Sequence, residues 1–382
     1  MSGSMGAMGA MGAMGAMGAM GAMGAMGASG VMGANGAMGI GNSDEGAWNL
    51  MLIDALIRTR GGINPAPTPL PEFGPKPGSL DAPNSMIRWA PSVRLHVALF
   101  ELLTPLRFST QGRSASLDHV ELDSPKKGQF EQTPVASLVR PGKDDKTFVW
   151  IFQEQAKLVN SWAELREDRA TEIVAQLAPQ FIFWDSICHL GLAARPGTLE
   201  LINLALTFAS SVEMRFKHAL ACPRPSAFSA AVQPVIPVPG HGSLPSGHAT
   251  EAFMVAHLLA TLLSARGGYA KREYDAYLQP LAARTSINRT IAGVHFPIDS
   301  HAGRHLGQSL SEYFLYRTGA RSTLGWQARQ FDGDAYAELD FDAYPAPIPG
   351  SQVAPRKAKP SLALAWFWKR AANEWKAGWG KQ

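Results

Sequence analysis

Three short segments of the chain contain side chains that could bind an oxyanion and react with it. The first is KHALACPRP, residues 217–225, in which Lys217 and Arg224 are two helical turns apart and can point the same way. Because Pro223 cannot continue a helix, we expect the helix from residue 197 to end before it. Both cations would attract an anion, but basic residues at a helix C-terminus also simply stabilise the helix dipole.

The second segment is HGSLPSGHAT, residues 241–250, directly before an apolar helix. Ser246 and Gly247 can donate from a hydroxyl and a backbone N–H at the positive end of that helix, which favours an anion. His248 lies in the first turn, where the dipole lowers its proton affinity and suits it to general acid or base catalysis. Taken alone, Pro-Ser-Gly is also an ordinary helix start.

The third segment is NRTIAGVHFPID, residues 288–299. Arg289 offers a planar fork of donors for oxygen atoms. Asp299, four residues after His295, can bind one imidazole nitrogen and leave the other as a nucleophile or a metal ligand. A purely structural His–Asp pair has the same spacing. Taken together, the three segments predict one cradle of cations around an oxyanion, with in-line chemistry at phosphorus or a phosphorus-like atom.

In this order the segments resemble the signature of the type-2 phosphatidic acid phosphatase and vanadium-dependent haloperoxidase superfamily. The matching patterns are Lys-x6-Arg-Pro, Pro-Ser-Gly-His and Arg-x5-His-x3-Asp, between Lys217 and Asp299. The chain departs from the usual pattern at Asn288, where the family usually has serine. The resemblance implies a helical bundle with the anion pocket at helix ends.

The resemblance also implies a role for each matching residue. The oxygens of vanadate or phosphate would be held by Lys217, Arg224, Ser246, Gly247 and Arg289. The catalytic residues would be His248, His295 and Asp299. In the haloperoxidases the residue at His295 ligates vanadium, and in the phosphatases it forms a phosphohistidine, while the residue at His248 transfers protons.

We favour a vanadate-dependent haloperoxidase that oxidises halide with hydrogen peroxide, by a small margin. Lipid phosphatases of this kind usually span membranes, whereas soluble haloperoxidases resemble this chain in having a long helical region before the first segment. His241 stands where bromide-oxidising members carry a histidine, which suggests a halide-side role.

Two alternatives stay open. The first is a phosphatase that hydrolyses phosphate monoesters without a cofactor, since GVHFPIDSHAG resembles phosphatases at least as closely. The second is an inactive scaffold that uses its tails for assembly.

Composition adds weaker limits. The 382 residues carry a net charge of +4 without a basic run, which argues against a nucleic-acid partner. Two cysteines indicate a reducing compartment, and we see neither a secretory signal nor an apolar run long enough to span a membrane. We therefore expect a soluble, cytoplasmic enzyme acting on small molecules, with homo-oligomerisation left open.

The predicted fold class is all-α, with four regions. Residues 1–46 are a low-complexity Met-Gly-Ala tail that we expect to be disordered, and 47–86 hold a short helix and a proline-rich arm. Residues 87–320 form the helical catalytic domain, with a polar, turn-rich stretch at 108–146 that has room for short strands. Residues 321–382 are a loop-rich extension with a Trp-rich terminal helix, which either docks on its own domain, as we favour, or contacts a membrane surface.

Overall fold

The computed structural model describes residues 50–63, 83–121, 131–177, 180–191, 194–264, 268–321, 325–355 and 360–376. The Met-Gly-Ala tail, most of the proline-rich arm and Trp379 of the terminal stripe lie outside these residues. The described chain is mostly helical, as the hydrophobic periodicity predicts.

Capping side chains and prolines fix the starts of several helices. Ser246 and Asp144 cap two of them by accepting hydrogen bonds from backbone N–H groups, and prolines open three others. The helices are α3 (Leu50–Ile63), α4 (Pro91–Leu103), α5 (Asp145–Trp162), α6 (Arg166–Ala175), α7 (Phe181–Cys188), α8 (Pro196–Leu220), α9 (Gly247–Leu263), α10 (Gly268–Ile291), α11 (Pro297–Arg317) and α12 (Leu362–Lys376).

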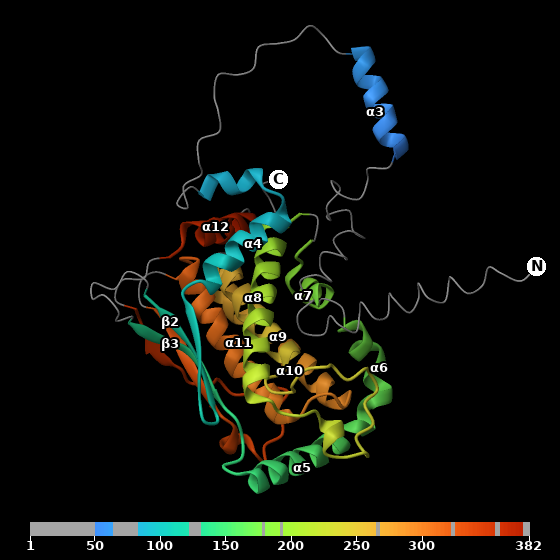
Figure 1. Ribbon diagram of the computed structural model, residues 1–382, viewed down its shortest axis with the longest axis vertical. Helices are drawn as coiled ribbons and strands as arrows, with labels where there is room; N and C mark the ends of the chain where they lie inside the picture. The colour runs from blue at the N-terminus through green and yellow to red at the C-terminus, as the bar shows by residue number, and fades with distance from the viewer. Residues whose placement is uncertain are drawn as a thin grey trace, which may run out of the picture.

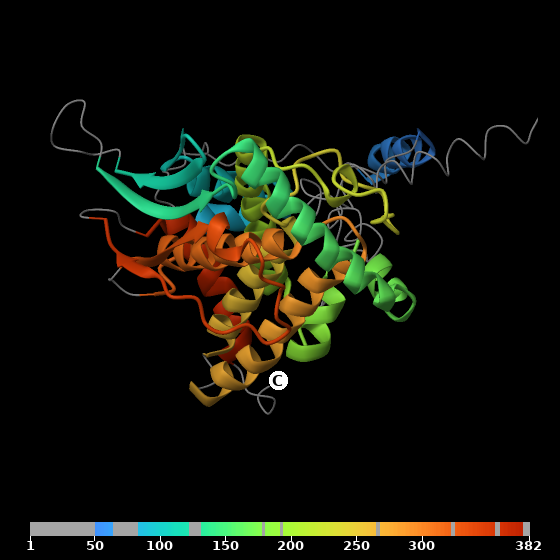
Figure 2. The same ribbon diagram turned by 90° about the horizontal axis from the view of Figure 1, so that it is seen from below.

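Helix α9 is the centre of the bundle. It packs against α8, α10 and α11, and all four run side by side in the body of the molecule (Figures 1 and 2). Helix α5 crosses one end of these helices (Figure 1). The three sequence segments with site residues lie at the ends of α8, α9, α10 and α11, so the bundle itself determines where they meet.

Two glycines let α9 approach α11 closely at the start of α9. A Cβ on Gly303 would lie 2.6 Å from the backbone oxygen of Ser246, and a Cβ on Gly307 would overlap the backbone oxygen of Thr250. The residues between them and around them are buried, including Leu306 and Leu310. This contact fixes the N-terminus of α9 against the first turns of α11, which carry Asp299.

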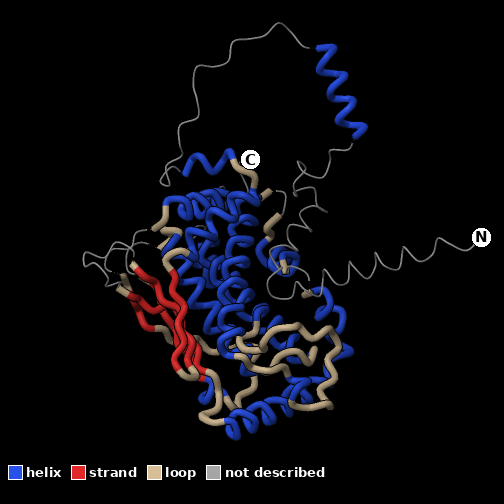
Figure 3. Tube along the Cα trace, viewed as in Figure 1, coloured by secondary structure: helices blue, strands red, loops and turns tan. Residues whose placement is uncertain are grey.

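A five-stranded sheet covers one flank of the bundle, and it corrects the prediction of an all-α fold (Figure 3). The strand order follows the sequence, and pairing is antiparallel except between β3 and β4. The strands are β1 (Leu106–Gln111), β2 (Ser114–Val120), β3 (Gln132–Val139), β4 (Trp326–Asp332) and β5 (Ser351–Val353).

The sheet buries its inner face against α11. Side chains alternate between buried and more exposed positions along β2 and β4, which is the period of a half-buried strand. The pairing of β4 with β3 joins segments almost two hundred residues apart, for example Ala136 with Arg329. Such a non-local partner leaves no local pattern, so the extension after residue 320 reads as loop from sequence alone.

The terminal helix α12 docks on its own domain, as favoured from its apolar stripe. Leu364, Ala371 and Trp375 are buried, and α12 packs against α8. The carboxylate of Glu374 accepts hydrogen bonds from two backbone N–H groups in the first turn of α8, which suits the positive end of that helix. Among the described residues no helix is both long enough and apolar enough to cross a membrane.

Candidate active site

His295, Asp299 and Arg224 form a buried chain of hydrogen bonds at the start of α11. His295 Nδ1 lies 3.0 Å from Asp299 Oδ2, and His295 Nε2 lies 2.9 Å from Arg224 Nη1. A carboxylate can only accept and a guanidinium can only donate, so Nδ1 carries the proton and Nε2 presents its lone pair. Asp299 therefore binds one imidazole nitrogen, as the spacing of four residues predicts, and the other nitrogen accepts a hydrogen bond from Arg224.

The carboxylate of Asp299 is itself held in place. It also accepts hydrogen bonds from the Phe296 backbone N–H at 2.9 Å and from the Ser243 hydroxyl at 3.2 Å. Burial raises the pKa of Asp299, and the Phe296 N–H and Arg224 oppose that rise. Burial and the neighbouring Arg224 charge hold the pKa of His295 well below its usual range, which keeps the ring neutral.

His241 contacts the same arginine from the other side. Arg224 Nη2 lies 3.1 Å from His241 Nδ1, and Arg224 Nε donates to the His241 backbone oxygen at 3.1 Å. Nδ1 also lies 3.1 Å from the Gly242 backbone oxygen, so it stands between a donor and an acceptor. The other ring nitrogen, Nε2, is buried without a hydrogen-bond partner among the described residues. Burial, with Lys217 and Arg224 nearby, lowers the pKa of His241 to about 4.

Lys217 joins α8 to the loop before α9. Its Nζ donates to the backbone oxygen of Pro245 and lies 3.4 Å from those of Gly242 and Ser243. The side chain is buried, and this burial lowers the pKa of Lys217. In this structure Lys217 therefore shapes the loop that carries the second segment, in addition to supplying positive charge.

Ser246 and Gly247 form the N-terminus of α9 next to the His295–Asp299 pair. The Ser246 backbone N–H donates to the Asp299 backbone oxygen at 2.9 Å, and its side chain caps α9 by accepting from Ala249 N–H. Both residues are buried. The positive end of α9 thus faces the start of α11, where an anion held by His295 would benefit from it.

His248 is held by a residue outside the three segments. Its Nε2 lies 3.0 Å from the backbone oxygen of Gln176, at the end of α6. A carbonyl only accepts, so Nε2 carries the proton and Nδ1 is the nitrogen that can take one up. Burial and then the Arg289 charge lower the pKa of His248 to about 3, so the imidazole is neutral.

Arg289 is fully buried and only partly bonded. Its Nη2 donates to the Ile173 backbone oxygen and to Gln176 Oε1, both at 3.0 Å. Its Nε and Nη1 have no partner among the described residues. Burial lowers the pKa of Arg289 to about 10, which still leaves it charged at neutral pH. Two buried donors of a charged group are therefore available to an anion.

The eight catalytic and anion-binding candidates, with His241, thus lie around the facing ends of α8, α9, α10 and α11. One family model matches this part of the chain, at residues 199–321, and it describes the PAP2 superfamily. Residues 199–321 form a PAP2 superfamily domain. The superfamily includes acid phosphatases and vanadium haloperoxidases. A search of curated proteins gave no match to the chain.

The PAP2 domain spans α8 to α11 and contains all three segments. Its departure at Asn288 has a visible structural role. Asn288 Nδ2 donates to Gln176 Oε1 at 3.0 Å, and its Oδ1 accepts from Arg169 at 3.1 Å. Asn288 therefore ties α10 to α6 beside Arg289.

Gln176 lies outside the PAP2 domain, and sequence reasoning missed it. Its oxygens bind His248, Asn288 and Arg289, and its Nε2 donates to Glu172 at 3.2 Å. The sequence around Gln176 contains no catalytic motif, because Gln176 is the residue that caps the C-terminus of α6. The contact with α10 spans more than one hundred residues of sequence and could not be found from spacing.

Glu213 is the second residue that the sequence analysis missed. It lies one helical turn before Lys217, its side chain is fully buried, and both carboxylate oxygens have no hydrogen-bond partner among the described residues. A Cβ on Gly247 would lie 2.5 Å from its Oε1, so the carboxylate lies against the α9 N-terminus. Burial raises the pKa of Glu213, and the Lys217 charge opposes this rise. The Glu-x3-Lys spacing on the predicted helix could have indicated that Glu213 lies beside Lys217.

The PAP2 site fits a tetrahedral oxyanion such as vanadate or phosphate. Three buried cations, Lys217, Arg224 and Arg289, surround a site in which Asp299 carries the neighbouring negative charge and protonation of Glu213 is favoured. The unpartnered buried donors of Arg289 are groups that an oxyanion requires.

Proposed function

We propose that this protein is a vanadate-dependent haloperoxidase that oxidises halide with hydrogen peroxide. The observation that carries the proposal is the set of hydrogen bonds that fixes the tautomers of the two histidines. His295 presents an unprotonated Nε2, and His248 is held neutral, so the site starts with a ligand and a base. A reaction that begins by removing a proton from hydrogen peroxide matches this state.

Each residue of the site would have its own role in this reaction. His295 Nε2 would hold vanadate, and Asp299 fixes the ring and its tautomer through Nδ1. Arg289, Arg224 and Lys217 would balance the charge of the oxygens, with Ser246 and Gly247 donating from the end of α9. Bound vanadate supplies a Lewis acid that activates hydrogen peroxide toward halide.

His248 Nδ1 would take the proton from hydrogen peroxide and later return it to the oxygen that leaves as water. In the net reaction halide, hydrogen peroxide and one proton give hypohalous acid and water, so that halide is oxidised and peroxide is reduced. His241, in the tautomer that accepts from Arg224 at Nδ1 and carries its proton on the buried Nε2, would hold the halide on this side of the site.

Phosphate monoester hydrolysis is the second candidate, and the fixed His295–Asp299 pair supports it. Here His295 Nε2 forms a bond to phosphorus while the ester P–O bond breaks, and His248 gives a proton to the leaving alkoxide. Water then cleaves the phosphohistidine. This route needs a protonated His248, and the burial that lowers its pKa to about 3 acts against that. A scaffold without activity is disfavoured by the intact set of polar contacts.

The test compares two reactions of the full-length protein. We expect orthovanadate to be required for peroxide-dependent bromination of a dione, and little hydrolysis of an aryl phosphate. His241→Phe should slow bromination and leave hydrolysis unchanged, and His295→Ala should abolish both. Hydrolysis that orthovanadate inhibits, without bromination, would establish the phosphatase. Absence of both reactions and of vanadate binding would establish the scaffold. A cytoplasmic location and a homo-oligomer stay predictions from the sequence.

A further inference from the structure

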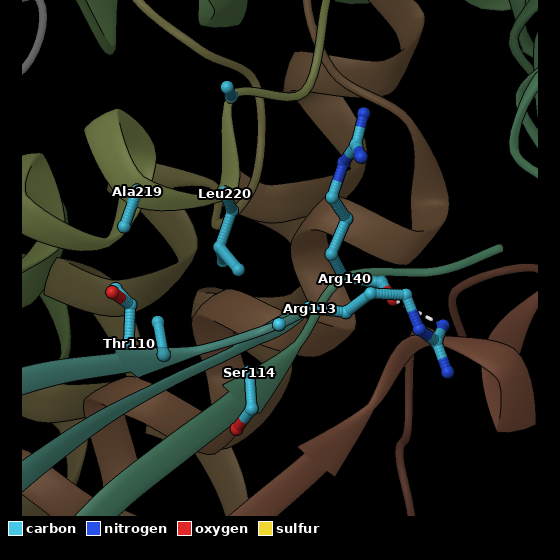
Figure 4. A pocket seen from close by; sticks show the side chains of 9 residues that line it. Thr110, Arg113, Ser114, Arg140, Ala219 and Leu220 are labelled. Carbon is cyan, nitrogen blue, oxygen red and sulfur yellow. Dashed lines mark hydrogen bonds between the residues drawn. The ribbon is translucent and has the colours of Figure 1, made fainter. Parts of the chain in front are cut away.

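A pocket of about 190 Å³ lies where the β1–β2 turn meets the C-terminal end of α8 (Figure 4). Its walls include Thr110 and Ser114 from the two strands, Ala219 and Leu220 from α8, and Arg140 just after β3. None of the predicted site residues lines it. The pocket exists because the sheet packs beside the first segment.

Arg140 is the charged group of this pocket that no carboxylate neutralises among the described residues. Its guanidinium stacks on the Phe148 ring at 3.8 Å, and its Nε is buried without a hydrogen-bond partner among the described residues. Arg113, the other arginine of the pocket, points away and donates to the Arg140 backbone oxygen at 2.7 Å (Figure 4). It also donates to the Asp334 carboxylate at 3.1 Å. Arg140 forms no such ion pair within the described part of the chain, so its charge is not neutralised by a carboxylate.

The remaining walls of the pocket indicate which other chemical groups a ligand with an anionic group could have. Leu220 and Ala219 form an apolar side, and Thr110 and Ser114 add hydroxyls. An engineered cavity of roughly 150 Å³ holds benzene, so this pocket has room for a single ring. A guanidinium pairs best with a planar carboxylate, through two parallel hydrogen bonds. The partial negative charge at the C-terminal end of α8 opposes an anion, so the Arg140 charge must outweigh it, and a ligand with one negative charge is opposed less than one with two.

We propose that this pocket binds a small organic acid, a single ring or short chain with one carboxylate held by Arg140. The position is next to the candidate active site. The Cys222 thiol is buried, bonds to Arg140 and lies close enough to Asp299 for that charge to raise its pKa. Two side chains, Arg140 and Cys222, therefore separate an organic acid in the pocket from Asp299. The inference does not rest on the proposed function, because it concerns binding alone.

The experiment titrates the full-length protein with benzoate, followed by calorimetry or ligand-observed NMR. Benzylamine, the same ring with the opposite charge, is the matched ligand control. Thr110→Phe fills the pocket and leaves Arg140 intact, whereas Ser109→Phe places the same ring on the other face of β1, where side chains are exposed. Arg140→Met removes the charge.

We expect millimolar benzoate binding and none of benzylamine. Thr110→Phe and Arg140→Met should each weaken benzoate binding by about tenfold or more, as expected for the loss of charge-assisted hydrogen bonds, and Ser109→Phe should leave it unchanged. Saturating orthovanadate should not displace benzoate. The proposal is overturned if benzoate does not bind, if Thr110→Phe binds it like Ser109→Phe, or if orthovanadate competes with it, since competition would place benzoate in the oxyanion site.

Discussion

The backbone oxygen of Gln176 accepts a hydrogen bond from His248 Nε2 at 3.0 Å. This contact makes Nδ1 the basic nitrogen of His248 and aims the ring from outside the PAP2 domain. The Gln176 side chain also accepts from Arg289 at 3.0 Å, so one residue positions both the proton carrier and an anion-binding cation. The second and third segments are therefore coupled through α6.

His248→Ala is expected to separate anion binding from chemistry. Since His248 transfers protons and is not assigned to hold the oxyanion, vanadate affinity should change by only a few-fold. Turnover should fall by roughly 10²–10⁴-fold, the usual contribution of a positioned acid or base. Equilibrium binding of orthovanadate and steady-state rates on the same preparation measure both effects. Loss of vanadate binding in this variant would contradict the assigned role.

Arg289→Gln should weaken oxyanion binding, because Arg289 offers two unpartnered buried donors. A charge-assisted hydrogen bond contributes about 1.5–3 kcal/mol, so the vanadate dissociation constant should rise roughly 10- to 100-fold. Arg169→Gln is the matched control. Arg169 lies on α6 and binds the Asn288 side chain, one step away from the anion. Equal losses in the two variants would show that general charge, and not direct contact, explains the effect.

Glu213→Gln should alter how oxyanion affinity depends on pH. Burial raises the pKa of Glu213, so rising pH ionises a carboxylate that lies against Gly247 and repels an anion. Affinity for sulfate, whose own charge is constant above neutrality, should therefore fall with pH in the wild-type protein. The variant should bind sulfate more tightly at alkaline pH, with a shallower decline caused by deprotonation of Lys217. Identical pH profiles would remove Glu213 from the site.

Gly307→Ala is predicted to destabilise the protein by about 1–3 kcal/mol, the usual cost of overpacking. The added methyl would overlap the Thr250 backbone oxygen and push α9 away from α11. Thermal unfolding should show a lower Tm, and oxyanion affinity should fall with it. Gly240→Ala provides the comparison, because no atom lies within 4 Å of a Cβ there. A Tm equal to that of Gly240→Ala would mean that the two helices tolerate the methyl group.

Stability should fall as pH drops below about 6.5. Burial lowers the pKa of several histidines in the folded protein. Between the folded and unfolded pKa values the unfolded chain therefore binds more protons than the folded one, so the free energy of unfolding falls as the pH falls. The lowered values are about 4 for His119, His241 and His301 and about 3 for His248 and His305.

Each such histidine contributes up to about 1.4 kcal/mol per pH unit in that window. Urea unfolding at pH 7, 6 and 5 measures the slope, which His305→Gln should reduce. Buried Asp299 and Glu213, whose pKa values are raised, act in the opposite sense. A free energy of unfolding that is flat between pH 7 and pH 5, in the wild type and in His305→Gln alike, would show that these histidines titrate in the folded protein near their unfolded pKa values.

The helices and the site residues could be predicted because their signals are local. Pro196, Ser246 and Pro297 mark helix starts, and the contact between His295 and Asp299 follows from a spacing of four residues near the start of α11. The convergence of Lys217, Arg224 and Arg289 followed from the resemblance, and not from spacing alone.

The sheet and the outer contacts of the site could not be predicted because they depend on distant partners. Trp326 and Phe331 of β4 are buried by pairing with β3 and packing on α11, which no local pattern reports. Gln176 contacts His248 and Arg289 only after α6 has packed beside α10. Arg140 likewise reaches Cys222 only when β3 lies next to the end of α8.

The most direct test is a reconstitution titration. Vanadate-free protein is titrated with orthovanadate, and bromide-dependent peroxide turnover is followed in the wild type and in His295→Ala. We predict that turnover is absent at the start, rises to a plateau at one vanadate per chain in the wild type, and stays absent in His295→Ala while its Tm is unchanged. Turnover that ignores vanadate, or that His295→Ala retains, would contradict the account.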